Sequence, residues 1–533
     1  MTTTTTKIGL EIHCQLTGAK SKLFCRCSSD YRGKAPNSNI CPICVGLPGT
    51  LPLLNQKTVE FAAMITLALG CKLPDEIAFY RKNYFYPDLP KNFQLTQYNA
   101  YSITSIGVDG KLKYENGKDA RIRRVQLEED PGRLVYSSGS MDTSVYVLID
   151  YNRAGVPLVE IVTEPDFADP KDVRIFLDKI TSIIEHLGVC DTKLEGSVRC
   201  DANVSIEGGN KVEIKNISSF ADVEKALRYE ITRQRTMTSR EIQVRSETRH
   251  WDDARKVTKE SRTKEEEQDY RYFPEPDIPL VMLGSEFVSF IKQSMPELPD
   301  IRKERFMSKY GLSAHIAQVL IGNKELADFF ESTLMIYLSP KEIANWIVTD
   351  LMSFIDERHK KEKEEYSLFA GLKVGPEHIA DLARLVDQDM INRATAKQIL
   401  GQIVRTGEMP SALAKRMHAS RIDDVSVLAQ AVQSVFQMEQ AAVQDARRNT
   451  NVANFLLGKV MKITKGKADP KAALEMIQKK LTSSSSSSSA PSSSSSSAAA
   501  PPPSSLFDSL GSGVLGGLLG LSSFGLTSTI GQP

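Results

Sequence analysis

Strict alternation of apolar and polar residues between positions 198 and 215 predicts a β-hairpin. The first half places Val198, Cys200, Ala202, Val204 and Ile206 on one face and Arg199, Asp201, Asn203 and Ser205 on the other. After a turn at 208–210 the alternation resumes, with Val212 and Ile214 opposite Lys211, Glu213 and Lys215. The charged face suits magnesium, phosphate and a carboxylate substrate. The pattern alone fits a solvated strand face with cross-strand charge pairs equally well.

Residues 8–290 mix short alternating stretches with a few helices, which is typical of an α+β domain. In the first strand, Glu11 and His13 lie on the face opposite Ile8, Leu10 and Ile12. Residues 156–162 predict an almost wholly apolar strand interrupted by Glu160. A carboxylate there is costly unless a cation or hydrogen bonds compensate it. One helix is expected after the capping residue Asp169, with Pro170 as its first residue and Gly188 at its end, and a second is expected to begin near Ser219.

Helical periodicity replaces the strand signals from about residue 296. We therefore predict an α+β domain at 1–295, a helical domain at 296–405 and a second helical domain at 406–481. Serine, alanine and proline runs follow, a composition that cannot bury enough surface to become ordered. The last residues are apolar but rich in Gly and Ser, unlike a membrane span. We predict a C-terminal extension at 482–533 in which 482–504 are disordered, whereas the Gly-rich segment 506–533 is either a docking tail or a segment without function.

The charge balance limits how the chain could meet a nucleic acid. Its 533 residues carry a formal net charge of +1, so any such contact needs a local basic surface. The stretch from Arg447 to Lys480 has nine Lys or Arg against only Asp469 and Glu475. It is either that surface or an ordinary solvated helical face. The N-terminus lacks the patterns of a signal or transit peptide, which favours a cytoplasmic protein without membrane contact.

Two close cysteine pairs, Cys25 with Cys27 and Cys41 with Cys44, predict a structural zinc site. Four thiolates would complete the tetrahedral coordination, so the metal would stabilise the fold and not activate water. The alternatives are reduced cysteines in a loop-rich lobe and a zinc ribbon that binds nucleic acid.

Carboxylates recur at or within apolar strands, and hard oxygen ligands of this kind suit magnesium bound with phosphate. Among them, Glu128 and Asp130 are interpreted as ordinary salt-bridged surface acids. Two proline-stiffened loops, 80–91 and 269–279, are rich in aromatic and basic residues. Lys82 and Lys91 in the first could hold nucleotide phosphates, or the loop could be a packed aromatic loop with incidental lysines. Neither a Walker-type P-loop nor a Gly-x-Ser-x-Gly elbow is present.

Several segments together resemble one family. They are IGLEIHCQL, CPICVGLPGTLP, RKNYFYPDLPKNFQLTQY, LEED, DYNRAGVPLVEIV, EGSVRCDANVSI, KVEIKN, DYRYFPEPDIP and the ending GKVMKITKGKADPKAALEMIQKKL. In this order they resemble the B subunit of the tRNA-dependent aspartyl/glutamyl amidotransferase, the GatB family, from about Lys7 to Leu481. Residues 482–533 have no counterpart in it. The large insertion expected of the related archaeal GatE is absent, which favours GatB.

The resemblance implies a mainly antiparallel β catalytic cradle with flanking helices, followed by two all-α domains. It implies a ligase that uses ATP to phosphorylate the side-chain carboxylate of Asp or Glu on misacylated tRNA, and then amidates it with glutamine-derived ammonia. Magnesium would be held by Glu11, His13, Glu129 and Glu160. The groups that position phosphates and the acceptor carboxylate would be Lys82, Arg199, Asp201, Glu213 and Lys215, with nucleotide contacts from Lys82, Lys91 and Arg199.

The implied partners are the amidase subunit GatA and the small subunit GatC, in a heterotrimer, together with tRNA bound by the basic tail. Two rival hypotheses remain. One is a free-standing ATP-dependent amide ligase that acts on a free amino acid. The other is a zinc-dependent RNA-binding module without catalysis.

Overall fold

The structure is a computed structural model that describes residues 5–483 with short gaps. The residues it leaves out in this range are 100–101, 116, 140–143, 218, 264–269, 363–367, 370, 418–424, 447–451, 465–467 and 469. The predicted disordered extension therefore lies outside the described residues, except for 482 and 483, which belong to a helix.

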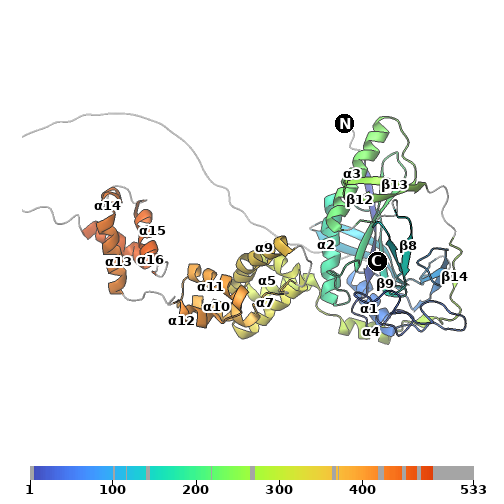
Figure 1. The fold of residues 1–533 in the computed structure, drawn as a ribbon, viewed down its shortest axis with the longest axis horizontal. Coiled ribbons are helices and arrows are strands. Elements are labelled where there is room, and N and C mark those ends of the chain that lie inside the picture. Colours follow the sequence, from blue (N-terminus) through green and yellow to red (C-terminus); the bar gives the residue numbers. More distant parts are fainter. Residues whose placement is uncertain are drawn as a thin grey trace, which may run out of the picture.

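A large twisted sheet forms the first domain (Figure 1). Its strand order is β13-β12-β11-β10-β1-β9-β6-β5, and all neighbours are antiparallel except β11 and β12. The strands are β1 (Thr6–Gln15), β5 (Gly107–Glu115), β6 (Lys118–Glu129), β9 (Pro157–Thr163), β10 (Val198–Ile206), β11 (Val212–Lys215), β12 (Glu247–Asp252) and β13 (Val257–Thr263). The predicted mainly antiparallel α+β domain is confirmed, and β10 and β11 are the predicted hairpin.

Strand β1 lies near the centre of this sheet, and its register positions the acidic and basic side chains. His13 is paired with Glu160 on β9 and with Arg199 on β10. Glu11 is paired with Asp201 on β10. Alternation places Ile8, Leu10 and Ile12 in the core on the other face, where they are fully or almost fully buried. Segments about 150 residues apart in sequence thus present their polar side chains on one face.

Three small sheets extend the domain beside the large one. They pair β3 (Tyr80–Asn83) with β4 (Phe93–Thr96) and β14 (Phe273–Pro274), β2 (Glu76–Ile77) with β15 (Val281–Met282), and β7 (Arg133–Tyr136) with β8 (Val147–Asp150). The first of these brings together the two aromatic loops that the sequence singled out, because β14 pairs with β3.

Helices α1 (Gln56–Ala68), α2 (Pro170–Leu187), α3 (Phe220–Ser239) and α4 (Ser285–Ser294) belong to the same domain. The Asp169 side chain caps α2, Pro170 is its first residue, and Gly188 ends it in the left-handed conformation, as predicted. Ser219 caps α3 in the same way. The apolar faces of α1, α2 and α3 join the strands in one core.

The rest of the described chain is helical and forms two further cores (Figure 1). The second core packs α5 (Pro299–Tyr310), α6 (Ala314–Ile321), α7 (Lys324–Ile336), α8 (Pro340–Asn345), a π-helix η2 (Trp346–Leu351), α9 (Met352–Glu362), α10 (Pro376–Asp387), α11 (Arg393–Thr406) and α12 (Pro410–Arg416). It includes Leu413 and Ala414, so it continues past the predicted boundary at 405. The third core packs α13 (Val425–Met438), α14 (Gln440–Ala446), α15 (Ala453–Ile463) and α16 (Pro470–Ser483).

The second core contacts the first through α2, since the Ser182 hydroxyl donates to the Ile321 carbonyl at 3.0 Å and α2 packs on α5 and α7. Among the described residues, no helix has the length and apolar character needed to cross a membrane.

Candidate active site

Glu11, His13 and Glu160 converge from β1 and β9, and one ligand atom from each lies within 4.8 Å of the others. His13 Nε2 lies 3.5 Å from Glu11 Oε1 and 3.6 Å from Glu160 Oε2. A third acid, Glu128 on β6, approaches the same imidazole nitrogen at 3.9 Å. The register of β1 against β9 and of β6 against β9 creates this group, which we call the acid–histidine cluster: Glu11, His13, Glu128 and Glu160.

The acid–histidine cluster holds more negative charge than its one histidine can balance. Burial opposes protonation of His13, but the hydrogen bond and charge of Glu160, with Glu11 and Glu128, raise its pKa to about 9. Burial raises the pKa of Glu128 to about 7, and the charge of Glu160 adds to this effect. Burial also raises the pKa of Glu11, with a further contribution from Glu160. A divalent cation among these side chains would compensate the surplus charge, and their oxygens are ligands that magnesium accepts.

Glu129 does not join this group, so its expected convergence with Glu11, His13 and Glu160 is wrong. Its carboxylate accepts from Lys91 Nζ at 2.5 and 2.7 Å and from the Leu95 backbone N–H at 2.9 Å. Consecutive residues of a strand point to opposite faces, and Glu129 therefore points away from the face that carries Glu128. Lys91 was expected to contact nucleotide phosphates together with Lys82. It lies instead beside Glu129 and lines a separate cavity of about 240 Å³, which the cysteine loops also line.

Lys82 on β3 and Lys215 on β11 face the acid–histidine cluster. Burial disfavours their charged forms, but nearby carboxylates, joined for Lys82 by tyrosine phenols, outweigh it and raise both pKa values. Lys82 Nζ also lies 4.8 Å from the centre of the Tyr270 ring. Lys215 Nζ lies 2.9 Å from Asp201 Oδ2 and 3.1 Å from Glu213 Oε1. The structure therefore brings together Lys82, Asp201, Glu213 and Lys215 around the cluster.

Arg199 on β10 is held by Asp130, whose carboxylate also accepts from Gln15 at 2.6 Å. The guanidinium of Arg199 donates to Asp130 Oδ1 at 3.0 Å. Burial opposes ionisation of Asp130, but Arg199 and Arg153 lower its pKa. Asp130 is 1% exposed and Glu128 is 4% exposed, so their interpretation as surface acids is wrong.

Two adjoining cavities meet at these side chains. The larger, of about 600 Å³, and the smaller, of about 270 Å³, are both lined by Glu11, Lys82, Glu128, Glu160 and Lys215. The larger continues towards Tyr98, Asn99, Tyr270 and Tyr272. The smaller continues towards His13, Arg199, Asp201 and Asn216. Two ligands could therefore approach the acid–histidine cluster from different directions.

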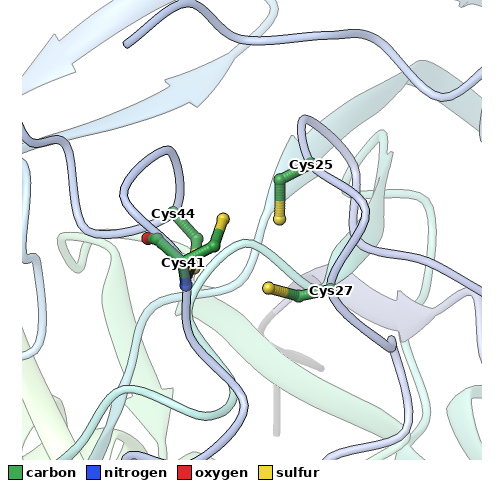
Figure 2. A group of neighbouring side chains, drawn as sticks. All are labelled: Cys25, Cys27, Cys41 and Cys44. Carbon is green, nitrogen blue, oxygen red and sulfur yellow. Dashed lines mark hydrogen bonds between the residues drawn. The ribbon is translucent and has the colours of Figure 1, made fainter. Parts of the chain in front are cut away.

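The four cysteines of the predicted zinc site also converge. One sulfur from each of Cys25, Cys27, Cys41 and Cys44 lies within 4.8 Å of the others, and Figure 2 shows the side chains of the two loops turned towards one another. Tetrahedral coordination with zinc–sulfur bonds of about 2.3 Å separates the sulfurs by roughly 3.8 Å, which agrees with this spacing. We call these four residues the cysteine cluster.

A buried lysine supports a metal in the cysteine cluster. Lys22 is fully buried, and its ammonium donates to the Asn39 carbonyl at 2.9 Å and approaches Cys44 Sγ at 3.8 Å. The hydrogen bond from Cys25 is the largest of the effects that lower the pKa of Cys44 to about 5. Four thiolates around Zn²⁺ carry a net charge of −2, which would compensate the buried ammonium.

Sequence reasoning missed Glu128, although strand parity could have found it. Val125 and Leu127 are core residues, so Gln126 and Glu128 must face the other way. Gln126 is paired with Glu160, which fixes the face that Glu128 shares. Asp130 follows the strand, and no signal in the sequence shows that it pairs with Arg199.

Comparison with known proteins shows the family of this chain. The family model for the GatB/GatE catalytic domain matches residues 6–289, and that for the GatB domain matches residues 328–481. The chain belongs to the GatB family. A relative from Sulfurisphaera tokodaii, named as the B subunit of an aspartyl/glutamyl-tRNA(Asn/Gln) amidotransferase, is 46% identical over 475 residues, which are 89% of this chain and 99% of the relative. A relative of the same name from Thermotoga maritima is 44% identical over 485 residues, 89% of this chain and 98% of the relative.

Proposed function

We propose that this GatB-family chain is the B subunit of a tRNA-dependent amidotransferase and holds its kinase and transamidase site. The substrate would be Asp or Glu esterified to the tRNA of Asn or Gln. ATP would phosphorylate the side-chain carboxylate, and ammonia derived from glutamine would displace the phosphate to leave an amide. The observation that carries the proposal is the meeting of two cavities at the acid–histidine cluster.

The chemistry explains why these side chains are needed. A carboxylate is a poor electrophile until it bears a leaving group, and phosphoryl transfer requires cations that offset the charge of the phosphates. Lys82 and Lys215 line both cavities, so their ammonium groups can meet phosphate oxygens where the two ligands come together. Arg199 lines only the smaller cavity, which favours that cavity for the acceptor carboxylate.

Magnesium fits the acid–histidine cluster, with Glu11, His13, Glu128 and Glu160 as the residues that would hold it. When bound, it would offset the negative charge of the phosphates. Zinc fits the cysteine cluster, where it would join two loops of one lobe and stabilise their fold.

The partners are proposed from the family and from charge. Glutamine hydrolysis would be the task of an amidase subunit, GatA, with GatC as the third subunit of a cytoplasmic heterotrimer. The third helical core, 425–483, would contact tRNA. Lys462, Lys471 and Lys479 are exposed on α15 and α16, as a surface that meets phosphates requires.

Phosphate release from ATP tests the proposal. The reconstituted complex should release phosphate with misacylated tRNA and not with uncharged tRNA or free aspartate. Dependence on free aspartate alone would favour the rival ligase of a free amino acid, and no release with any of the three would contradict both.

The tRNA contact has a separate test. Deletion of residues 418–533 leaves the second core complete and removes the third, so tRNA affinity should fall and its dependence on salt should become shallower. Unchanged affinity and salt dependence would place the tRNA contact elsewhere.

A further inference from the structure

The end of the larger cavity away from Arg199 is built unlike the rest of the site. It is lined by Tyr98, Asn99, Tyr270 and Tyr272, whereas carboxylates and lysines line the shared end. The rings of Tyr98 and Tyr272 are stacked, with centroids 3.9 Å apart and planes 7° apart. Tyr98 follows β4 and Tyr272 precedes β14, so the small sheet holds both in place. A rigid aromatic wall of this kind suits a flat ring.

Asn99 presents a directed hydrogen-bond donor beside this wall. Its Oδ1 accepts from the Thr104 backbone N–H at 3.0 Å, from the Ser105 backbone N–H at 2.8 Å and from the Ser105 hydroxyl at 2.9 Å. These bonds fix which end of the amide is oxygen. Within the described part of the chain, Nδ2 makes no hydrogen bond and is left to donate to a ligand.

The neighbouring Gln97 is built in the same way. Its Oε1 accepts from the backbone N–H groups of Ile106 and Leu127 at 3.0 and 2.9 Å. Its Nε2 is buried and has no hydrogen-bond partner among the described residues. A buried donor without a partner is costly, so the Gln97 amide indicates an absent acceptor at this end of the cavity, beside the half-buried Asn99 amide.

We propose that this end of the larger cavity binds an adenine base, stacked on the Tyr98–Tyr272 pair and recognised through the amide N–H of Asn99. Adenine is flat and offers ring nitrogens as acceptors, whereas the corresponding edge of guanine carries an N1–H donor that would oppose the Asn99 donor. The inference rests on the proposed function, which supplies two sources of adenine: ATP and the 3′-terminal adenosine of tRNA. The cavity volume of about 600 Å³ lies in the range that encloses ligands of nucleotide size.

The position of Lys82 favours ATP as the source. Its ammonium lies 4.8 Å from the Tyr270 ring centre and lines the cavity between the aromatic and acidic ends. A base against the tyrosines would therefore direct its phosphates towards Lys82 and the acid–histidine cluster.

Asn99→Asp tests the inference because it keeps the oxygen that holds Thr104 and Ser105 and replaces only the donor. The measurement is calorimetric binding of ATP and of GTP, each with Mg²⁺, to the complete complex. The ATP-to-GTP affinity ratio should fall about 100-fold, since a carboxylate repels adenine N1 and accepts from guanine N1–H. The matched control is Asn210→Asp, the same change at an exposed turn between β10 and β11, where the ratio should stay unchanged. Tyr272→Ala should weaken both nucleotides about tenfold through lost stacking.

A second arm uses misacylated tRNA ending in adenosine or in cytidine. If Asn99→Asp keeps the nucleotide ratio but abolishes the preference for terminal adenosine, the adenine belongs to tRNA. If neither selectivity changes in a complex whose wild type binds ATP, the inference is overturned while the proposed function stands. A wild-type complex that binds no nucleotide would overturn the proposed function itself.

Discussion

The acid–histidine cluster and the cysteine cluster are both candidate metal sites in one domain, but the chain builds them in different ways. The cysteine cluster uses two loops separated by fewer than twenty residues, and it is a closed set of four soft ligands. The acid–histidine cluster draws on β1, β6 and β9, and it opens onto two cavities. A closed set suits a structural ion, whereas an open set leaves coordination positions for substrate. The two clusters should therefore respond differently to mutation.

The largest expected effect is on activity, from Glu160→Gln. The change removes a proposed magnesium ligand of the open cluster and the main partner that charges His13, so phosphate release should fall at least ~1,000-fold. Zinc content, thermal unfolding and tRNA affinity should stay unchanged, and each is measured on the same preparation. Asp166→Asn is the control, because Asp166 is exposed and pairs with Arg121 outside the cluster. Retained activity in Glu160→Gln would remove the acid–histidine cluster from the mechanism.

The opposite pattern is expected for Cys44→Ser. Loss of one thiolate should abolish stoichiometric zinc, measured by elemental analysis, and leave Lys22 without its charged partner. The unfolding temperature of the first domain should fall by roughly 5–10 °C, as the loss of a few kcal/mol produces in a domain of this size. Cys71→Ser, at a buried cysteine outside the cluster, should keep the zinc. A wild-type protein without stoichiometric zinc would contradict the site.

A smaller effect separates the two neighbouring glutamates of β6. Glu128→Gln should weaken Mn²⁺ binding about tenfold, whereas Glu129→Gln should leave it within about twofold. Glu129→Gln should instead destabilise the fold by about 3 kcal/mol, because it leaves the largely enclosed ammonium of Lys91 without its carboxylate partner. Titration with Mn²⁺ followed by electron paramagnetic resonance, together with chemical unfolding, distinguishes the two. Equal losses of Mn²⁺ affinity would mean that strand parity does not decide the ligand set.

The two clusters also show what a sequence can reveal. The convergence of the four cysteines could be predicted from their spacing alone, because two short loops bring their thiolates close together. The first strand, the hairpin and the capped helices could be predicted because periodicity and caps are local signals. Strand parity separates the faces of Glu128 and Glu129, but which of these faces meets Glu160 depends on pairing with a strand about thirty residues away. The pairing of Lys91 with Glu129 likewise depends on tertiary packing that no local pattern encodes.

The aromatic end of the larger cavity illustrates the same limit. Tyr98 and Tyr272 are far apart in sequence: Tyr272 lies in the aromatic loop 269–279, whereas Tyr98 comes after the loop 80–91. Their stacking depends on the small sheet that joins β3, β4 and β14. The Gln97 oxygen is held by Ile106 and by Leu127 of the large sheet, a contact that no local pattern encodes. Recognition chemistry of this kind becomes visible only when unpaired donors can be counted in three dimensions.

Anomalous diffraction from crystals of the complete complex, soaked in Mn²⁺ and recorded at the manganese and zinc edges, tests the central claim most directly. The account predicts a manganese peak bounded by Glu11, His13, Glu128 and Glu160, and a zinc peak among Cys25, Cys27, Cys41 and Cys44. A manganese peak beside Glu129 and Lys91, or none at the acid–histidine cluster, would contradict it.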